Sequence, residues 1–194
     1  MHKVLENNEY IDQYNWSSLI KPEDNNQIMF IAKDIIDSGN YFQNSPKFQT
    51  KENLFARPEP VWLKMRQSFI YSCFMYLGRE VKIKNIMSWV FMTNERDSEP
   101  RENMWHNHHI NDNQGTTGTV SGIWYVHIPK DVTNPDLTGT EFSLSGPAEF
   151  ADSFFLKPNE LTWNVYPSKL WHRPGITDSL DYRFVFAADM EYYL

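Results

Sequence analysis

Residues 160–190, ELTWNVYPSKLWHRPGITDSLDYRFVFAADM, give the clearest indication of the fold. The two ends of this stretch, 160–167 and 182–190, are rich in β-branched and aromatic residues and predict strands. The polar cluster PGITDSLD lies between them and has no helical periodicity. Three more strands are predicted upstream, at 81–93, 121–129 and 139–144. Because no helical pattern lies between the late strands, we expect an antiparallel sheet rather than a parallel α/β sheet.

Two helices are predicted in the first 80 residues. Residues 61–77 place apolar side chains every three or four positions, and Gly78 can end that helix. Residues 23–37 show the same spacing in their isoleucines. We therefore expect an α+β fold that forms a single domain, with a helical segment at 1–80 packed on a β core at 81–194.

Composition narrows the function classes. The chain has 194 residues, of which 41% are hydrophobic and 15% aromatic, so it can bury a core and is not mainly disordered. Its net charge of −7 makes nonspecific nucleic-acid binding unexpected, because acidic surfaces repel phosphate backbones. One cysteine, Cys73, excludes an internal disulfide and a cysteine-based zinc cluster. We expect neither a leader segment nor a membrane span, and place the chain in the cytoplasm.

Three of the six histidines lie within five residues, Trp105 to His109. Residues two apart on a strand point the same way, so His106 and His108 can reach one metal ion while His109 should face away. Neutral imidazole is a good ligand for iron, zinc, nickel and copper. The alternative is a polar loop whose histidines contact solvent.

His172 and Arg183 extend this pattern. His172 ends the run YPSKLWH at 166–172, directly after a predicted strand. Arg183 follows eleven residues later, in a strand otherwise made of aromatic and aliphatic residues. A buried arginine needs a carboxylate or phosphate partner, which is either a ligand or a protein carboxylate. The remaining alternative is that Arg183 lies exposed on an edge strand.

Together these residues resemble the iron(II)- and 2-oxoglutarate-dependent dioxygenases, whose fold is a double-stranded β-helix, or cupin-like jelly roll. That family has a His-x-acid motif, a distal histidine about 50 to 70 residues later and an arginine about ten residues further on. Here His172 lies 66 residues after His106. The strand IWYVH at 123–127 and the run GTEF at 139–142 are similar to strands of prolyl hydroxylases.

A bacterial and phage subgroup of that family is more similar still. Its members have His-x-His, then Ser-Gly-apolar-Tyr-Tyr, then Phe-Pro-Ser-x-Leu-x-His, then an arginine. The corresponding segments here are His106–His108, SGIWY at 121–125, YPSKLWH at 166–172, and Arg183. The resemblance covers residues 86–188 and implies that N-terminal helices pack on the major sheet of the double-stranded β-helix. If the chain is encoded by a phage, the expected location becomes the host cytoplasm.

The resemblance also implies a site and an activity. His106, His108 and His172 would bind Fe(II), and Arg183 with Tyr125 would hold 2-oxoglutarate. The reaction with O2 would hydroxylate an unidentified substrate and release succinate and CO2. A protein side chain such as proline is a plausible target, and a small metabolite or a modified nucleotide is also possible.

The sequence departs from the family at His108, where most members have Asp or Glu. Three neutral ligands would leave the iron more positive than a set with one carboxylate. Asp112 could replace His108 as a ligand or could contact a ligand. Residues 111–119 could cover the site or form a surface insertion. Glu141 is expected to face solvent, and Asn94 to form a turn.

Two other functions stay open. One is a cupin-like metalloenzyme that does not use 2-oxoglutarate and so has no need of a dicarboxylate clamp at Arg183 and Tyr125. The other is a non-catalytic jelly-roll binding module, in which the histidines bind no metal.

Overall fold

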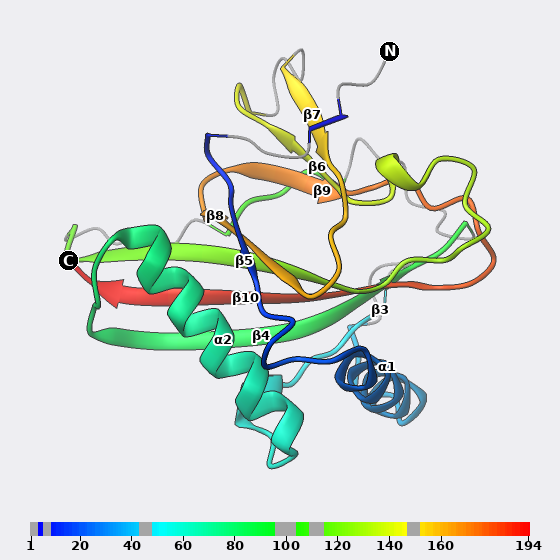
Figure 1. Ribbon diagram of the computed structural model, residues 1–194, viewed down its shortest axis with the longest axis horizontal. Helices are drawn as coiled ribbons and strands as arrows, with labels where there is room; N and C mark the ends of the chain where they lie inside the picture. The colour runs from blue at the N-terminus through cyan, green and yellow to red at the C-terminus, as the bar shows by residue number, and fades with distance from the viewer. Residues whose placement is uncertain (1–3, 6–8, 43–47, 96–103, 109–114, 147–151) are drawn as a thin grey trace.

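The computed structural model describes residues 4–5, 9–42, 48–95, 104–108, 115–146 and 152–194. Two sheets face each other, and two helices cover the outer side of the larger one (Figure 1). The helices are α1 (Pro22–Asp37) and α2 (Pro60–Leu77), with 3-10 turns η1 (Leu54–Ala56) and η3 (Pro135–Leu137). Neither helix is long and apolar enough to cross a membrane.

The larger sheet has six strands in the order β2-β8-β5-β10-β4-β3, and the smaller has four in the order β1-β7-β6-β9. Within the larger sheet every pair of neighbours is antiparallel, as expected. The larger sheet comprises β2 (Asp12–Asn15), β3 (Phe48–Gln49), β4 (Ile83–Thr93), β5 (Thr117–His127), β8 (Thr162–Pro167) and β10 (Arg183–Tyr193). The smaller comprises β1 (Val4–Leu5), β6 (Thr140–Ser143), β7 (Ser153–Leu156) and β9 (Trp171–Pro174).

These elements confirm the α+β prediction, and both helices lie within one residue of their predicted bounds. Strand β5 begins at Thr117, so the end of the stretch 111–119 is strand rather than loop. Residues 109–114 lie outside the described residues. The strands β1, β2, β3, β7 and β9 were not predicted as strands from the sequence.

Helix α2 packs across the larger sheet through a mostly apolar face, in which the buried Ser68 accepts a hydrogen bond from the Trp163 indole over 2.9 Å. Trp62, Met65 and Phe69 are completely buried, and the Phe69 ring lies 4.8 Å from that of Trp163 on β8. Gly122 on β5 allows this close approach, since a Cβ atom there would lie 2.7 Å from the Phe69 ring. Gly78 ends the helix in the left-handed conformation, at φ 65°.

The alternation along β10 divides the molecule into two cores. Phe184, Phe186, Ala188 and Met190 belong to the core beneath the helices. Val185 and Ala187 face the other way, into the core between the two sheets. Since successive residues of a strand point to opposite faces, Arg183 and Asp189 share the face of Val185 and Ala187. This inner face forms one wall of the site.

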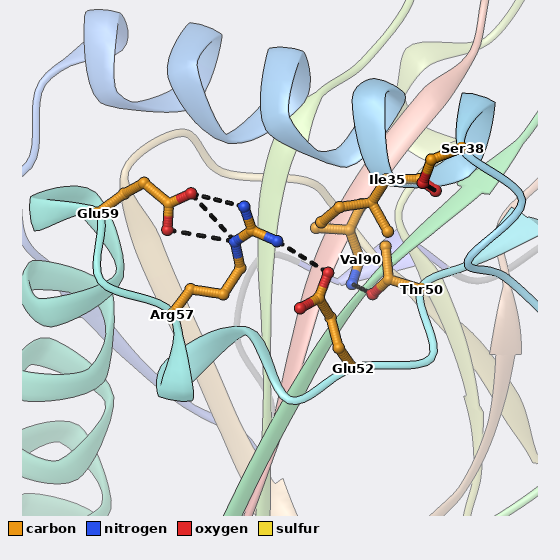
Figure 2. Close-up of polar contacts among 7 residues, drawn as sticks. All are labelled: Ile35, Ser38, Thr50, Glu52, Arg57, Glu59 and Val90. Carbon is orange, nitrogen blue, oxygen red and sulfur yellow. Dashed lines mark hydrogen bonds and ion pairs between the residues drawn. The ribbon is translucent and has the colours of Figure 1, made fainter.

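The segment between α1 and α2 is attached to β4. Figure 2 shows the backbone N–H of Val90 donating to the Thr50 hydroxyl over 3.1 Å. It also shows Arg57 bonded to Glu52 at 2.8 Å and Glu59 at 2.6 Å. Those three charged side chains are about a quarter to a third exposed, so their ion pairs contribute about 1 kcal/mol or less each. The buried bond to β4 therefore adds to these ion pairs in holding the segment.

Candidate active site

Backbone pairing brings the three predicted histidines together. His106 and His172 form an antiparallel bridge in which each N–H donates to the other's carbonyl, at 3.0 and 2.9 Å. The N–H of His108 donates to the carbonyl of Ser168 over 2.9 Å. The histidines thus come from the strand β9 and from residues 104–108, which lie alongside it.

Each imidazole is oriented by a hydrogen bond from Nδ1. The Nδ1 atoms of His106 and His172 lie 2.8 and 3.0 Å from the carbonyls of Met104 and Leu170. Since a carbonyl only accepts, these Nδ1 atoms carry the proton and Nε2 offers a lone pair. The third ring, that of His108, bonds the Asp189 carboxylate over 2.9 Å. This is the arrangement that metal-ligating histidines adopt.

The three rings converge on one point. One ring nitrogen from each histidine lies within 4.8 Å of those from the other two. Burial lowers the pKa of His172 well below its usual value, and the nearby His106 and His108 lower it further. His172 is therefore neutral near pH 7, which is the form that binds a metal. The donor set of three imidazoles fits a divalent transition metal such as Fe(II).

A cavity of about 540 Å³ opens beside the histidines. Arg183, Thr140 and Tyr166 line it together with all three rings. Its remaining wall is mostly apolar, with Phe42, Trp89, Phe91, Met104, Ile123, Val185 and Ala187. The volume lies within the usual range for small-molecule sites.

Arg183 lies deep in this cavity with only 1% of its surface exposed. Its guanidinium donates to the carbonyls of Thr138 and Gly139, both at 2.5 Å, which fixes its orientation. Strand β10 lies between β5 and β4, so the alternative of an exposed edge position is excluded. A guanidinium has five N–H donors and can hold carbonyls and a carboxylate together.

Tyr125 lies against Arg183, whose guanidinium carbon is 5.7 Å from the tyrosine ring centre. Its hydroxyl donates to Thr140 Oγ1 over 3.1 Å. Burial raises the pKa of Tyr125 to about 12, so the hydroxyl stays a donor at neutral pH. Thr140 lines the cavity, whereas Tyr125 does not belong to the described residues that line it.

The structure therefore places His106, His108, His172 and Arg183 around one cavity, with Tyr125 next to Arg183. Asp112 and His109 lie outside the described residues. Asp189 was not predicted as a site residue, although alternation along β10 from Arg183 puts it on the inner face. Tyr166 was not predicted as one either, and its hydroxyl oxygen lies 3.4 Å from Nε2 of His172.

Two smaller expectations are corrected. Glu141 does not face solvent: it is 2% exposed and pairs with Arg173 at 2.8 Å. The reason is that β6 lies between β7 and β9, and Arg173 of β9 is its cross-strand partner. Asn94 is also buried rather than in an open turn, and its amide donates to the Leu180 carbonyl over 3.3 Å.

No protein-family model matches the chain, and no curated protein matches its sequence. Solved structures do match. A Pseudomonas putida prolyl-4-hydroxylase is 10% identical with a TM-score of 0.59, over 94% of this chain and 92% of that one. A viral collagen prolyl hydroxylase from Paramecium Bursaria Chlorella virus-1, in complex with 2-oxoglutarate, is 11% identical with a TM-score of 0.55, over 95% and 97%.

The epimerase SnoN, in complex with Fe³⁺, α-ketoglutarate and nogalamycin RO, is 6% identical with a TM-score of 0.63. That match covers 94% of this chain and 78% of SnoN. At such low identities these likenesses show the fold alone. They confirm the double-stranded β-helix with N-terminal helices on its major sheet, and the resemblance to the iron(II)/2-oxoglutarate dioxygenases at the level of fold.

Proposed function

We propose that this chain is an Fe(II)- and 2-oxoglutarate-dependent oxygenase that hydroxylates a substrate and releases succinate and CO2. The observation that carries the proposal is one cavity that contains three oriented histidines and a buried arginine. Structures of the same fold bind the same cofactors: one holds Fe³⁺ with α-ketoglutarate, and another holds 2-oxoglutarate.

The metal would be held by His106, His108 and His172. Their Nδ1 atoms are each bonded to an oxygen, so the Nε2 lone pairs are directed by the protein before any metal binds. When bound, Fe(II) with 2-oxoglutarate and O2 supplies the oxidising power for breaking an unactivated C–H bond. The protein's own contribution is to fix these ligands, to hold the cosubstrate and to exclude water.

Arg183 would hold the carboxylate of 2-oxoglutarate that lies away from the metal. Its planar fork matches a carboxylate with two parallel hydrogen bonds, and its burial makes those bonds strong. The pair Tyr125 and Thr140 would assist, since the Thr140 hydroxyl lines the cavity and Tyr125 holds it in place.

The substrate would occupy the apolar part of the cavity. Trp89 and Phe91 from β4 and Met104 give this wall its character, and Phe42 adds a half-exposed ring. Such a wall favours a neutral, compact group over a charged one. A protein side chain such as proline fits these walls, and prolyl hydroxylases are among the structural matches.

The proposal is tested by measuring succinate formed from 2-oxoglutarate in the presence of Fe(II) and O2, by NMR, with a proline-containing peptide and without one. We expect succinate from the wild type and none from His172→Ala, because that variant loses a buried ligand. Because SnoN shows that the fold also supports epimerisation, the product must be identified by mass, with a gain of one oxygen expected.

The two alternatives give different results when a metal titration accompanies the succinate assay. Tight metal binding without any succinate would support a cupin-like metalloenzyme that does not use 2-oxoglutarate. Absence of stoichiometric metal binding would support a non-catalytic binding module. Either result would overturn the proposed oxygenase.

A further inference from the structure

Asp189 stands out among the polar groups around the three histidines. His106 and His172 both donate from Nδ1 to neutral backbone carbonyls. The Nδ1 atom of His108 instead lies 2.9 Å from the carboxylate oxygen Oδ1 of Asp189. Within the part of the chain that the structure describes, no lysine or arginine forms an ion pair with Asp189. The described Nδ1 partner of His108 is therefore an acidic side chain rather than a backbone carbonyl.

The contact belongs to a closed ring of polar groups. Ser121 donates to the same oxygen of Asp189 over 2.6 Å, and its own oxygen lies 2.8 Å from Ser168 Oγ. The carbonyl of Ser168 in turn accepts the backbone N–H of His108 over 2.9 Å. Both the imidazole and the backbone N–H of His108 are thus hydrogen-bonded to the same cluster. Ser121 and Ser168 are at most 2% exposed, whereas the side chains of His108 and Asp189 are 16% and 21% exposed, so solvent competes least for the bond between the two serines.

The strands hold the cluster rigidly. Asp189 lies on β10 opposite Ser121 of β5, and on its other side it faces Met87 of β4. Side chains on strands are positioned more precisely than those on loops. Here Asp189 and Ser121 lie on strands, whereas the His108 that they hold lies in a loop segment. The orientation of His108 is therefore set from the central strand of the sheet.

We propose that Asp189 is a positioning residue that supplies, through the His108 imidazole, the negative charge that a set of three neutral ligands lacks. This rests on the proposed metal site. A carboxylate bonded to the far nitrogen of a ligating histidine fixes its tautomer and makes it a stronger donor. One formal negative charge, that of Asp189, is thereby kept near the metal, with the His108 imidazole between them. His108 is the ligand that this charge strengthens.

The inference is tested by Co(II) titration of the full-length protein, followed through the visible absorption of the bound metal. Asp189→Asn keeps an acceptor and the shape but removes the charge. We expect it to weaken Co(II) binding by about 10- to 100-fold and to shift the absorption bands. Asp181→Asn is the matched control, because Asp181 forms another His–Asp contact among the described residues, 3.3 Å from His127. It should leave Co(II) affinity unchanged.

A second pair of variants tests whether the effect passes through the imidazole. His108→Asp removes the ring through which Asp189 is proposed to act. In that background Asp189→Asn should change Co(II) affinity by much less than the about 10- to 100-fold expected in the wild type. This loss of effect separates an action through His108 from general damage to the fold, because a damaged fold weakens binding in both backgrounds.

The outcomes separate the inference from the proposed function. If the wild type binds no Co(II), the metal site itself is wrong. If the wild type binds Co(II) and Asp189→Asn binds it equally well, the site stands and the role of Asp189 is refuted. Equal weakening by Asp189→Asn in both backgrounds would also refute it.

Discussion

The role of Arg183 gives the most quantitative prediction. We consider Arg183→Met, which keeps most of the side-chain volume and removes the charge and all five N–H donors. The arginine is 1% exposed, so solvent does not replace it as a partner for a bound carboxylate. The carbonyls of Thr138 and Gly139 lose their donors as well.

The magnitude follows from burial. Removing one partner of a buried ion pair costs about 3–5 kcal/mol, because the other charge is left uncompensated. For 2-oxoglutarate this corresponds to a loss of affinity between about a hundred-fold and a few thousand-fold. The variant Arg183→Lys keeps the charge but loses the planar fork, so it should fall between the wild type and Arg183→Met.

The assay is anaerobic calorimetric titration of the Mn(II)-loaded protein with 2-oxoglutarate, preceded by a separate Mn(II) titration. We expect Mn(II) affinity to be unchanged in Arg183→Met, because the three histidines do not contact Arg183 through any described bond. A thermal melt checks that the metal-free variant is folded. Affinity for 2-oxoglutarate within threefold of the wild type would refute the assignment.

Three further predictions follow from other parts of the structure. Tyr125→Phe removes the donor to Thr140 and should weaken the binding of 2-oxoglutarate by about 1 kcal/mol, or roughly fivefold, in the same titration. An effect as large as that of Arg183→Met would contradict the secondary role given to Tyr125. Gly122→Ala places a methyl group 2.7 Å from the Phe69 ring and should lower the free energy of unfolding by about 1–3 kcal/mol in urea, and an unchanged midpoint would show that α2 does not pack as described. In the metal-free protein burial lowers the pKa of His172, so as the pH falls the unfolded chain binds the extra proton before the folded protein does. The stability that neutral His172 contributes is therefore present above about pH 6.5, and below that pH the free energy of unfolding should fall by about 1.4 kcal/mol per pH unit relative to His172→Asn. An equal loss in the two proteins between pH 7.5 and 5.5, measured by urea unfolding, would contradict this prediction.

Long, periodic elements could be predicted from the sequence because local pattern and tertiary environment agree in them. The 18 residues of helix α2 contain its periodic apolar pattern, and Gly78 directly after them marks its end. The strands β5 and β10 are equally clear, since each has 11 residues and a buried central run. Long elements therefore carry enough local information to place the main sheet and the helix that covers it.

The short strands could not be predicted in the same way. Strand β9 has four residues, WHRP, with no apolar alternation, and it is a strand because it pairs with β6. Strand β7, SFFL, is equally short and depends on β6 as well. Pairing between segments far apart in the sequence decides such cases, and a local pattern does not contain it.

The sequence likewise identifies some residues of the candidate site and not others. His106, His108, His172 and Arg183 could be singled out because their residue types and spacing are unusual, and the structure places them around one cavity. The hydrogen-bonding partners of the site residues could not be identified from the sequence, because those contacts depend on the register between paired strands. Glu141 was expected to face solvent as a charged residue of a short strand, and its cross-strand partner Arg173, 32 positions further along the chain, could not be identified from the sequence.

Asp189 is an intermediate case. Period-two alternation from Arg183 places it on the inner face of β10, which the sequence does contain. Its contact with His108 spans 81 positions and depends on how residues 104–108 approach β10. Sequence reasoning could therefore have placed Asp189 on the correct face without identifying its partner.

One cavity is proposed to bind a metal and 2-oxoglutarate together. The most direct test is the visible spectrum during anaerobic addition of Fe(II) and then 2-oxoglutarate to the metal-free protein. We expect an absorption band that requires both components, is absent from His172→Ala, and needs far more 2-oxoglutarate in Arg183→Met. Metal binding without such a band at saturating 2-oxoglutarate would contradict the claim.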